Sequence, residues 1–145
     1  MSSSTSLCQR LRERERALEE KMQPLQSAEA RYQWIMEQGR QMPQLPKEEW
    51  TPEFRVQGCQ SEMYLKVTLV DGGLHMIVGS DALISAGLAA LLLELYEGLN
   101  PEEVIRCPLE VFKRLGLGEQ LSPGRAQGLQ ALYRTMYSRA GAYIP

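Results

Sequence analysis

The sequence has a single histidine, His75, and only three cysteines, which are the widely separated Cys8, Cys59 and Cys107. One histidine excludes a metal site built from several histidines and a relay of several imidazoles. Three cysteines at such intervals form neither a disulfide framework nor a CxxC metal pattern. We therefore expect three reduced thiols, as is usual in a cytosolic protein.

Excess positive charge and long hydrophobic runs are also missing. The net charge is -2 and the pI is near 5.5, so no overall basic field attracts nucleic acid. The uncharged run between Asp81 and Glu94 is too short to span a bilayer. Residues 1–6 are serine-rich, but charged residues follow them in place of the apolar segment of a secretory signal. We expect a cytoplasmic protein that binds neither nucleic acid nor membrane.

The composition that remains is typical of a soluble globular protein, with 43% hydrophobic and 23% charged residues in a chain of 145. This length predicts one domain over residues 1–145. Apolar residues at helical spacing among charges predict an amphipathic N-terminal helix, with its apolar positions at Leu7, Leu11, Leu18, Met22 and Leu25. We assign this helix to residues 1–25 and the core of the domain to residues 26–145.

The middle of the chain predicts a helix, a loop and a hairpin. The helix has Ser27 as its N-cap and stops at Gly39. Prolines then exclude regular structure over residues 40–52, and so long a loop in a small domain is often functional. Apolar and polar residues alternate on both sides of the turn-forming residues 71–73, which predicts an antiparallel hairpin with His75 on its outer face.

The second half predicts several helices. A helix that is apolar on all sides follows the hairpin, with Ser80 as N-cap, Asp81 in its first turn and Gly98 at its end. Asn100, followed by proline and two acids, begins a short helix. The last helix begins at Ser122-Pro123. Helices on both sides of one hairpin-based sheet predict an α+β fold.

Cys59 lies between the irregular segment and the first strand, where a thiol is easily presented to a partner. Gly58 frees the backbone to turn sharply before it. Attack on an electrophilic sulfur requires a thiolate, which nearby cations or dipoles must favour. A stored persulfide also benefits from shelter, which predicts a loop that can tuck the sulfur against the core. The alternative is that Cys59 is only a small residue that fills a turn.

Two polar residues are candidates to support Cys59. Arg125 falls in the first turn of the last helix, where a cation opposes the helix dipole by about 0.3–1 kcal/mol. We therefore expect an acidic neighbour or an anionic sulfur to compensate it. Asp81 stands where the dipole of the central helix favours an acid, and this alone is a sufficient alternative explanation for it.

The run Arg55-Val56-Gln57-Gly58-Cys59-Gln60-Ser61 resembles the signature of the SufE/CsdE family of sulfur acceptors. The resemblance spans residues 32–140, and its other motifs are Gly39-Arg40-Gln41-Met42-Pro43, Ser80-Asp81-Ala82, Gly87-Leu88, Leu115-Gly116-Leu117, Leu121-Ser122-Pro123-Gly124-Arg125 and Gly128-Leu129. It implies a small curved antiparallel sheet packed on one side by helices, as in the IscU-like cluster scaffold proteins. It also implies that Cys59 is the persulfide acceptor and that Asp81 and Arg125 affect loop dynamics and acceptor reactivity.

The resemblance implies partners as well. A pyridoxal-phosphate cysteine desulfurase of the SufS or CsdA type would pass sulfur to Cys59 and be stimulated, and iron–sulfur scaffold proteins would receive the sulfur. The chain would then be a carrier and not an independent enzyme, without cofactor or metal, as a monomer or homodimer. The chain departs from the family pattern after Ser61, where Glu62-Met63-Tyr64 replaces the frequent Gln-Val-Trp, and at Gly124, which replaces a frequent serine.

Other functions remain open at this stage. A scaffold that binds an iron–sulfur cluster or metal needs several ligands near Cys59, and only His75 is available to approach it. A regulatory module that binds a desulfurase would work without the cysteine. A cysteine hydrolase is disfavoured because its base would have to be His75, on a strand.

Overall fold

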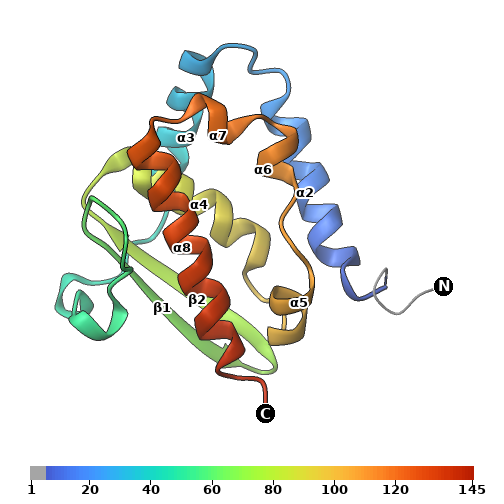
Figure 1. Ribbon diagram of the computed structural model, residues 1–145, viewed down its shortest axis with the longest axis vertical. Helices are drawn as coiled ribbons and strands as arrows, with labels where there is room; N and C mark the ends of the chain where they lie inside the picture. The colour runs from blue at the N-terminus through green and yellow to red at the C-terminus, as the bar shows by residue number, and fades with distance from the viewer. Residues whose placement is uncertain (1–5) are drawn as a thin grey trace.

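The computed structural model describes residues 6–145, so most of the serine-rich stretch considered above lies outside the described residues. The elements are α2 (Gln9–Met22), α3 (Ala28–Gln41), the 3-10 turns η1 (Lys47–Glu49) and η2 (Pro52–Phe54), β1 (Met63–Val70), β2 (Gly73–Ser80), α4 (Leu83–Tyr96), α5 (Pro101–Arg106), α6 (Val111–Arg114), α7 (Leu117–Gln120) and α8 (Pro123–Gly141) (Figure 1). A two-stranded sheet with helices before and after it confirms the predicted α+β fold.

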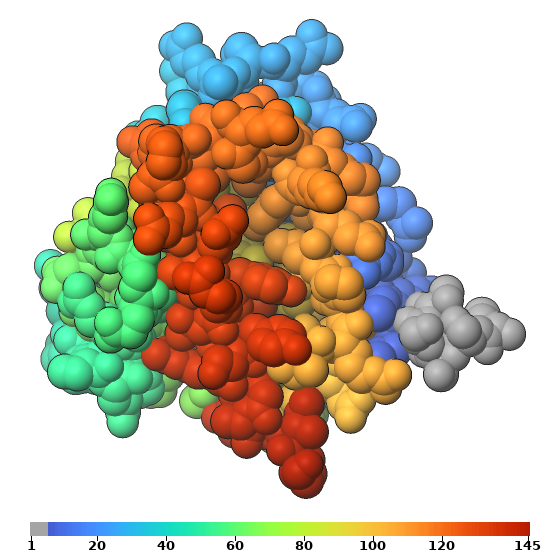
Figure 2. All heavy atoms as spheres, viewed as in Figure 1, coloured from blue at the N-terminus to red at the C-terminus, as the bar shows by residue number. Residues whose placement is uncertain are grey.

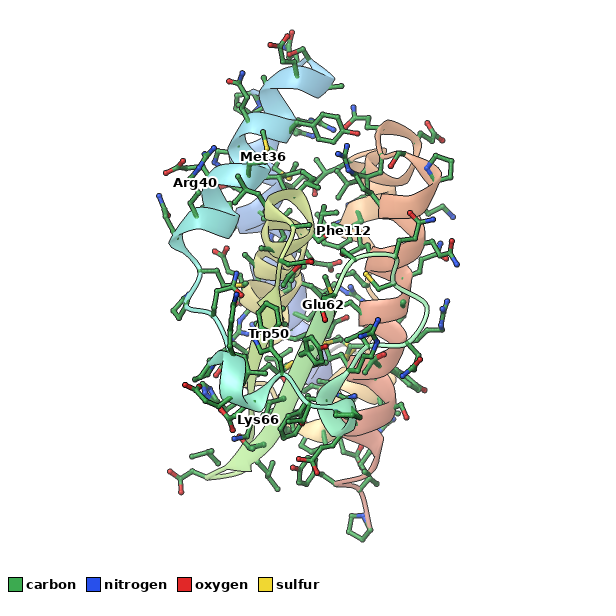
Figure 3. All side chains as sticks on the ribbon, turned by 90° about the vertical axis from the view of Figure 1, so that its left-hand side faces the viewer. Met36, Arg40, Trp50, Glu62, Lys66 and Phe112 are labelled. Atoms are coloured by element: carbon green, nitrogen blue, oxygen red, sulfur yellow. A yellow bond between two sulfur atoms is a disulfide. The ribbon has the colours of Figure 1, made fainter. Side chains whose placement is uncertain are left out.

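The hairpin is confirmed in detail. β1 and β2 pair antiparallel from Met63↔Ser80 to Val70↔Gly73, and the turn between them uses positive φ angles at Asp71 (50°) and Gly72 (81°). Helices α4 and α8 pack on one face of the sheet. The segment 44–54 covers part of the other face, where Trp50 stacks on Tyr64 with ring centroids 5.2 Å apart. Figure 3 looks onto this side and shows Trp50, Glu62 and Lys66 there.

Residues 40–52 are more ordered than the sequence predicted. Gln44 forms a parallel bridge with Val78, and η1 follows shortly after it. The indole of Trp50 donates a hydrogen bond to the carbonyl of Leu45 at 2.8 Å. The prolines exclude long helices and strands, but they leave short 3-10 turns possible, and these turns bring Trp50 onto the sheet.

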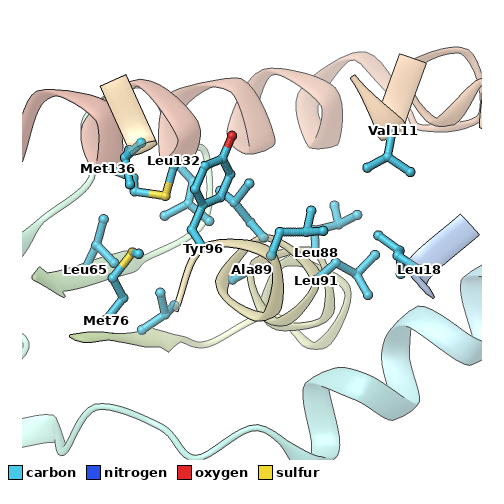
Figure 4. Close-up of a cluster of buried hydrophobic side chains, with 14 of the residues drawn as sticks. Leu18, Leu65, Met76, Leu88, Ala89, Leu91, Tyr96, Val111, Leu132 and Met136 are labelled. Atoms are coloured by element: carbon cyan, nitrogen blue, oxygen red, sulfur yellow. The ribbon is translucent and has the colours of Figure 1, made fainter. Parts of the chain in front are cut away.

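The hydrophobic core surrounds α4. Its side chains lie between the sheet, α8 and α2, as Figure 4 shows for Leu18, Leu65, Met76, Leu88, Ala89, Leu91, Tyr96, Leu132 and Met136. Because neighbours cover α4 on all sides, an apolar sequence without a polar stripe is the expected one. Within residues 6–145, no helix combines the length and the apolar character that crossing a membrane requires.

The sequence predicted that Gly39 ends α3, and this prediction was wrong. The crossing of α3 and α4 gives Gly39 another role. The helix continues to Gln41, and a Cβ added at Gly39 would lie 2.7 Å from the backbone nitrogen of Gly87. A side chain at either glycine would therefore force the two helices apart. Gly39 is a packing residue inside the helix, not a stop signal.

The start of α4 also differs from the prediction. Ser80 is the last residue of β2, and its backbone N–H donates to Gln44 Oε1 at 2.9 Å. Asp81 follows in a bend, Ala82 is the N-cap, and no side chain caps the helix. Strand pairing thus keeps Ser80 extended, so the predictions of Ser80 as cap and of Asp81 in the first turn were wrong.

Helix α2 packs on the rest of the fold. Leu11, Leu18 and Met22 are buried, and the buried Glu15 carboxylate accepts the backbone N–H groups of Glu110 and Val111 at 2.7 and 2.8 Å. These bonds satisfy donors at the N-terminus of α6.

A disulfide joins Cys8, at the start of α2, to Cys107, just after α5. The prediction of three reduced thiols was therefore wrong. Spacing along the chain gave no sign of the bond, because the two Cα atoms come within 5.5 Å only when α2 docks beside α5.

Candidate functional site

Cys59 lies on the loop that joins η2 to β1, which is the place that the sequence predicted, and its side chain is half-buried. The preceding Gly58 has a φ of +87°, a conformation that other residues rarely adopt. Within residues 6–145, which hold all three cysteines, Cys59 is the one free thiol.

Two glycines of α8 form the floor under this loop. A Cβ at Gly128 would lie 3.1 Å from Cys59 Sγ, and one at Gly124 would lie 2.5 Å from Gln60 Oε1. The first turns of α8 therefore carry no side chain where the loop rests. The departure from serine at Gly124 has a physical reason, because Gln60 occupies the space of a side chain there.

The sulfur of Cys59 has polar neighbours on its other side. Sγ lies 3.5 Å from the hydroxyl of Ser61, which lies 3.2 Å from the hydroxyl of Ser85 in α4. This row of groups connects the loop to the central helix. A hydroxyl can donate to a thiolate, so the row is suited to holding an anionic sulfur.

Cys59 opens into a cavity of about 560 Å³ between α4 and α8. The lining is apolar at Met63, Ile84, Leu88, Ala89, Leu129 and Leu132, with polar groups at Gln60, Ser61, Ser85, Ser122 and Arg125. Such a cavity can shelter a sulfur atom added to Sγ from water while leaving polar groups beside it. The sequence predicted a loop that can tuck the sulfur against the core, and a role of this cavity in holding a persulfide stays a prediction.

Arg125 lines the same cavity, which agrees with its predicted place near Cys59. Ser122 caps α8 as predicted, accepting the backbone N–H of Arg125 at 3.3 Å. The guanidinium of Arg125 lies over the ring of Tyr32, 5.5 Å from its centroid. An aromatic face, in place of the expected acid or anionic sulfur, thus offsets the cation within the described residues.

Asp81 is exposed and does not line the cavity, although its neighbour Ala82 does. Its backbone N–H donates to the carbonyl of Glu62 at 3.4 Å, which ties the end of the Cys59 loop to the head of α4. Its carboxylate makes no hydrogen bond or ion pair with any residue in the 6–145 range. A role for Asp81 in loop dynamics stays a prediction, tested by the alkylation rate of Cys59 in Asp81→Arg.

Arg139 is a residue of this region that sequence reasoning missed. From the last turns of α8 it donates to the backbone carbonyls of Phe54 (3.2 Å), Arg55 (3.1 Å) and Leu65. Burial lowers the pKa of its guanidinium, because desolvation disfavours the charged form. Arg139 fixes the base of the Cys59 loop, and nothing in its local sequence marks it among the other arginines.

His75 lies away from Cys59. Its Nδ1 is 2.8 Å from Glu97 Oε2, and it stands five residues along β2 from Ser80, about 16 Å at the usual strand rise. Among residues 6–145, no three His, Cys, Asp or Glu side chains are grouped as ligands for a metal ion. The donor set of a cluster scaffold is therefore not assembled around Cys59 in the described part of the chain.

Fold and site together define a small α+β protein that presents one free thiol on a loop, above a largely apolar cavity. The model of the SufE family, a domain associated with Fe-S metabolism, matches residues 16–140, and the chain belongs to this family. A hypothetical protein from Thermus thermophilus, whose solution structure is known, has a similar fold, with a TM-score of 0.73 at 24% identity. That match covers 89% of this chain and 94% of the other. Family membership associates the protein with iron–sulfur metabolism.

Proposed function

We propose that the protein accepts sulfur on Cys59 from a pyridoxal-phosphate cysteine desulfurase, stimulates that enzyme and delivers the sulfur for iron–sulfur cluster assembly. The observation that carries the proposal is the position of Cys59, half-buried at the cavity between α4 and α8. Membership of a family associated with Fe-S metabolism supports it. The chain acts in this scheme as the acceptor component of the desulfurase system.

The transfer step needs no external oxidant or reductant. The Cys59 thiolate attacks the terminal sulfur of a persulfide on the desulfurase. A new S–S bond forms to Cys59 Sγ, while the old S–S bond breaks and the desulfurase cysteine leaves as a thiolate. The product on Cys59 is a persulfide. The hydroxyl of Ser61, which is in turn hydrogen-bonded to that of Ser85, stands close enough to solvate its charge.

The cavity suggests how the persulfide survives between donor and acceptor. Its apolar wall, which includes Leu88 and Leu129, would cover one side of the terminal sulfur and limit its contact with water and small reductants. Arg125 is proposed to support the anionic sulfur from the polar side of the same cavity. Delivery to a scaffold protein then requires the loop to leave its seat on Gly128.

The cytoplasm is the proposed compartment, and the Cys8–Cys107 bond bears on this point. Disulfides persist in oxidising compartments and are rare in the cytosol, where the two thiols would stand side by side in reduced form. Labelling of free thiols in freshly lysed cells distinguishes the two states. The proposed carrier reaction uses neither Cys8 nor Cys107.

The test is the intact mass of the protein after incubation with free cysteine and an active desulfurase. The wild type should gain one or more sulfur atoms that a reductant removes, and Cys59→Ser should gain none. A variant with Cys8→Ser and Cys107→Ser, which keeps Cys59, is the matched control and should be loaded like the wild type. The absence of added sulfur with several active desulfurases would contradict the carrier function. Full stimulation by Cys59→Ser would favour a regulatory binding module instead.

A further inference from the structure

A second cavity lies on the opposite side of the Cys59 loop. Its volume is about 530 Å³, and it is lined by Arg55, Gln57, Gly58, Ala131, Arg134, Thr135, Ser138 and Arg139. We call it the arginine cleft. The loop and α8 lie side by side on the face of the molecule that Figure 2 presents. Gly58 lines the arginine cleft and Cys59 lines the first cavity, so the loop itself is the wall between them.

Among the described residues that line it, the arginine cleft has three cations and no acid. None of Arg55, Arg134 and Arg139 forms an ion pair within the described residues, although the whole chain has a net charge of -2. Ion pairs elsewhere use seven other arginines and lysines, Arg10, Arg12, Lys21, Arg40, Lys66, Arg106 and Arg114. Positive charge is therefore concentrated beside the Cys59 loop.

The three arginines have different free donors. Arg139 is occupied by the carbonyls of the loop base, as described above. Arg55 donates to the Tyr64 hydroxyl at 3.4 Å, and this hydroxyl donates to Glu62 Oε1 at 3.1 Å, so an acid lies beyond the tyrosine. The other side-chain donors of Arg55 make no hydrogen bond within residues 6–145. The exposed Arg134 makes no hydrogen bond or ion pair in the 6–145 part, and its Nη2 lies 3.8 Å from the Cβ position of Gly58. Arg55 and Arg134 thus offer planar donor groups to a ligand.

We propose that the arginine cleft receives carboxylate side chains from an acidic surface segment of the desulfurase when that partner docks to load Cys59. This inference rests on the proposed function and adds the chemistry of the partner surface. A guanidinium group fits a carboxylate with two parallel hydrogen bonds, and a carboxylate in the cleft places a negative charge beside Arg55 and Arg134. Opposite charge also speeds encounter of the two proteins.

The arginine cleft lies next to the loop that carries Cys59, so a partner bound in the cleft is close to this loop. A carboxylate bound to Arg134 contacts the side of the loop that carries Gly58, one residue from Cys59. Docking there places the acceptor thiol at the centre of the interface, with the sheltering cavity on the far side of the loop. Because Cys59 Sγ lies on the cavity side of the loop, sulfur transfer then requires the loop to swing Sγ toward the docked partner.

The experiment measures the Kd of the full chain for a pyridoxal-phosphate cysteine desulfurase at low and high salt. Arg134→Glu should weaken binding on the order of tenfold at low salt, and high salt should reduce the difference. Arg16→Glu is the matched control, because Arg16 is also an exposed helical arginine without an ion pair in the described residues. It should change Kd by less than about twofold. Both variants should keep the thermal unfolding midpoint of the wild type.

Equal weakening by Arg134→Glu and Arg16→Glu would overturn the proposal, since net charge alone would explain it. A second result would also overturn the proposal. If the wild type binds inorganic phosphate and Arg134→Glu abolishes this binding without changing the desulfurase Kd, the cleft is a site for small anions. Different results test the docking site and the carrier function. If Arg134→Glu is loaded with sulfur on Cys59 as well as the wild type at limiting partner concentration, only the docking site is rejected. If the Kd depends on salt but Cys59 is never loaded, only the carrier function is rejected.

Discussion

At the scale of single residues, Gly128 controls how closely Cys59 can approach α8. A glycine in a helix interior usually costs about 0.5–1 kcal/mol relative to alanine, so its presence there calls for a packing reason. The reason is the sulfur, which would lie 3.1 Å from a Cβ at this position. One methyl group is enough to disturb the seat of the thiol.

Gly128→Ala is expected to speed alkylation of Cys59 by iodoacetamide at least about twofold, because the added methyl group pushes Sγ away from α8 and toward solvent. The rate is measured by intact mass against time. Gly118→Ala is the control, since a Cβ there meets no atom within 4 Å. Identical rates for the two variants would mean that the floor under Cys59 does not govern its exposure.

The part of the site that lies within a few residues of Cys59 could be predicted from the sequence. Gly58 indicated a sharp turn, and the polar residues after Cys59 indicated a loop before the strand. The floor at Gly128 and the clamp at Arg139 come from a helix far along the chain, and no local pattern connects them to the loop. The cation–π contact of Arg125 with Tyr32 was missed for the same reason, because α3 supplies the tyrosine.

At the scale of secondary structure elements, one residue of α5 both caps its own helix and contacts α2. Asn100 and Glu103 form a reciprocal capping box, and the same Glu103 carboxylate pairs with Arg10 of α2. Burial of Glu103 tends to raise its pKa, but the hydrogen bonds from Arg10 and from the Asn100 backbone outweigh burial and lower it. The contact with Glu103 raises the pKa of Arg10.

This contact predicts a loss of stability in acid. Because the pKa of Glu103 is lower in the folded chain than in the unfolded one, its contribution is complete above the unfolded pKa of about 4.3 and disappears as pH falls through the folded pKa. Urea unfolding between about pH 6 and pH 3 should therefore show a flatter pH dependence in Glu103→Gln than in the wild type. Glu102→Gln, whose partner Arg106 is exposed, is the control and should follow the wild type. Parallel curves for all three proteins would refute the role of Glu103.

Elements that have clear local sequence signals were predicted correctly. The predicted helix boundaries were wrong where tertiary contacts determine them. The hairpin turn at 71–72 and the caps Asn100 and Ser122 depend on neighbouring residues and were confirmed. Gly39 and Ser80 carry the local signals of a helix stop and a helix cap. Packing on Gly87 extends α3 past Gly39, and strand pairing holds Ser80 in β2.

At the scale of the whole molecule, the Cys8–Cys107 bond joins residues with a sequence separation of 99. Such a crosslink restricts the unfolded chain, and a loop of this length corresponds to at most about 4–5 kcal/mol of stability. Much of the described fold lies within that loop. The bond also ties α2, which is otherwise held by Leu11, Leu18 and Met22, to the end of α5.

Removal of the bond by Cys8→Ser with Cys107→Ser should lower the free energy of unfolding by about 2–4 kcal/mol without changing the α+β fold. Denaturant unfolding measures the loss, and circular dichroism checks the fold. Cys59→Ser should leave the stability within about 0.5 kcal/mol of the wild type, because its side chain is only half-buried. A double variant as stable as the wild type under non-reducing conditions would mean that the two cysteines are not crosslinked in solution.

The disulfide has one more consequence, which concerns connectivity. Residues 8–107 form a closed covalent ring, and the loop with Cys59 is a part of that ring. A single proteolytic cut near Glu53 or Gln57, both exposed, would open the ring without dividing the molecule. Under non-reducing conditions the nicked protein would still run as one species, and only a reductant would release two fragments. The bond thus keeps α2 and α3 covalently attached to the sheet and α8 even when the backbone beside the acceptor thiol is broken.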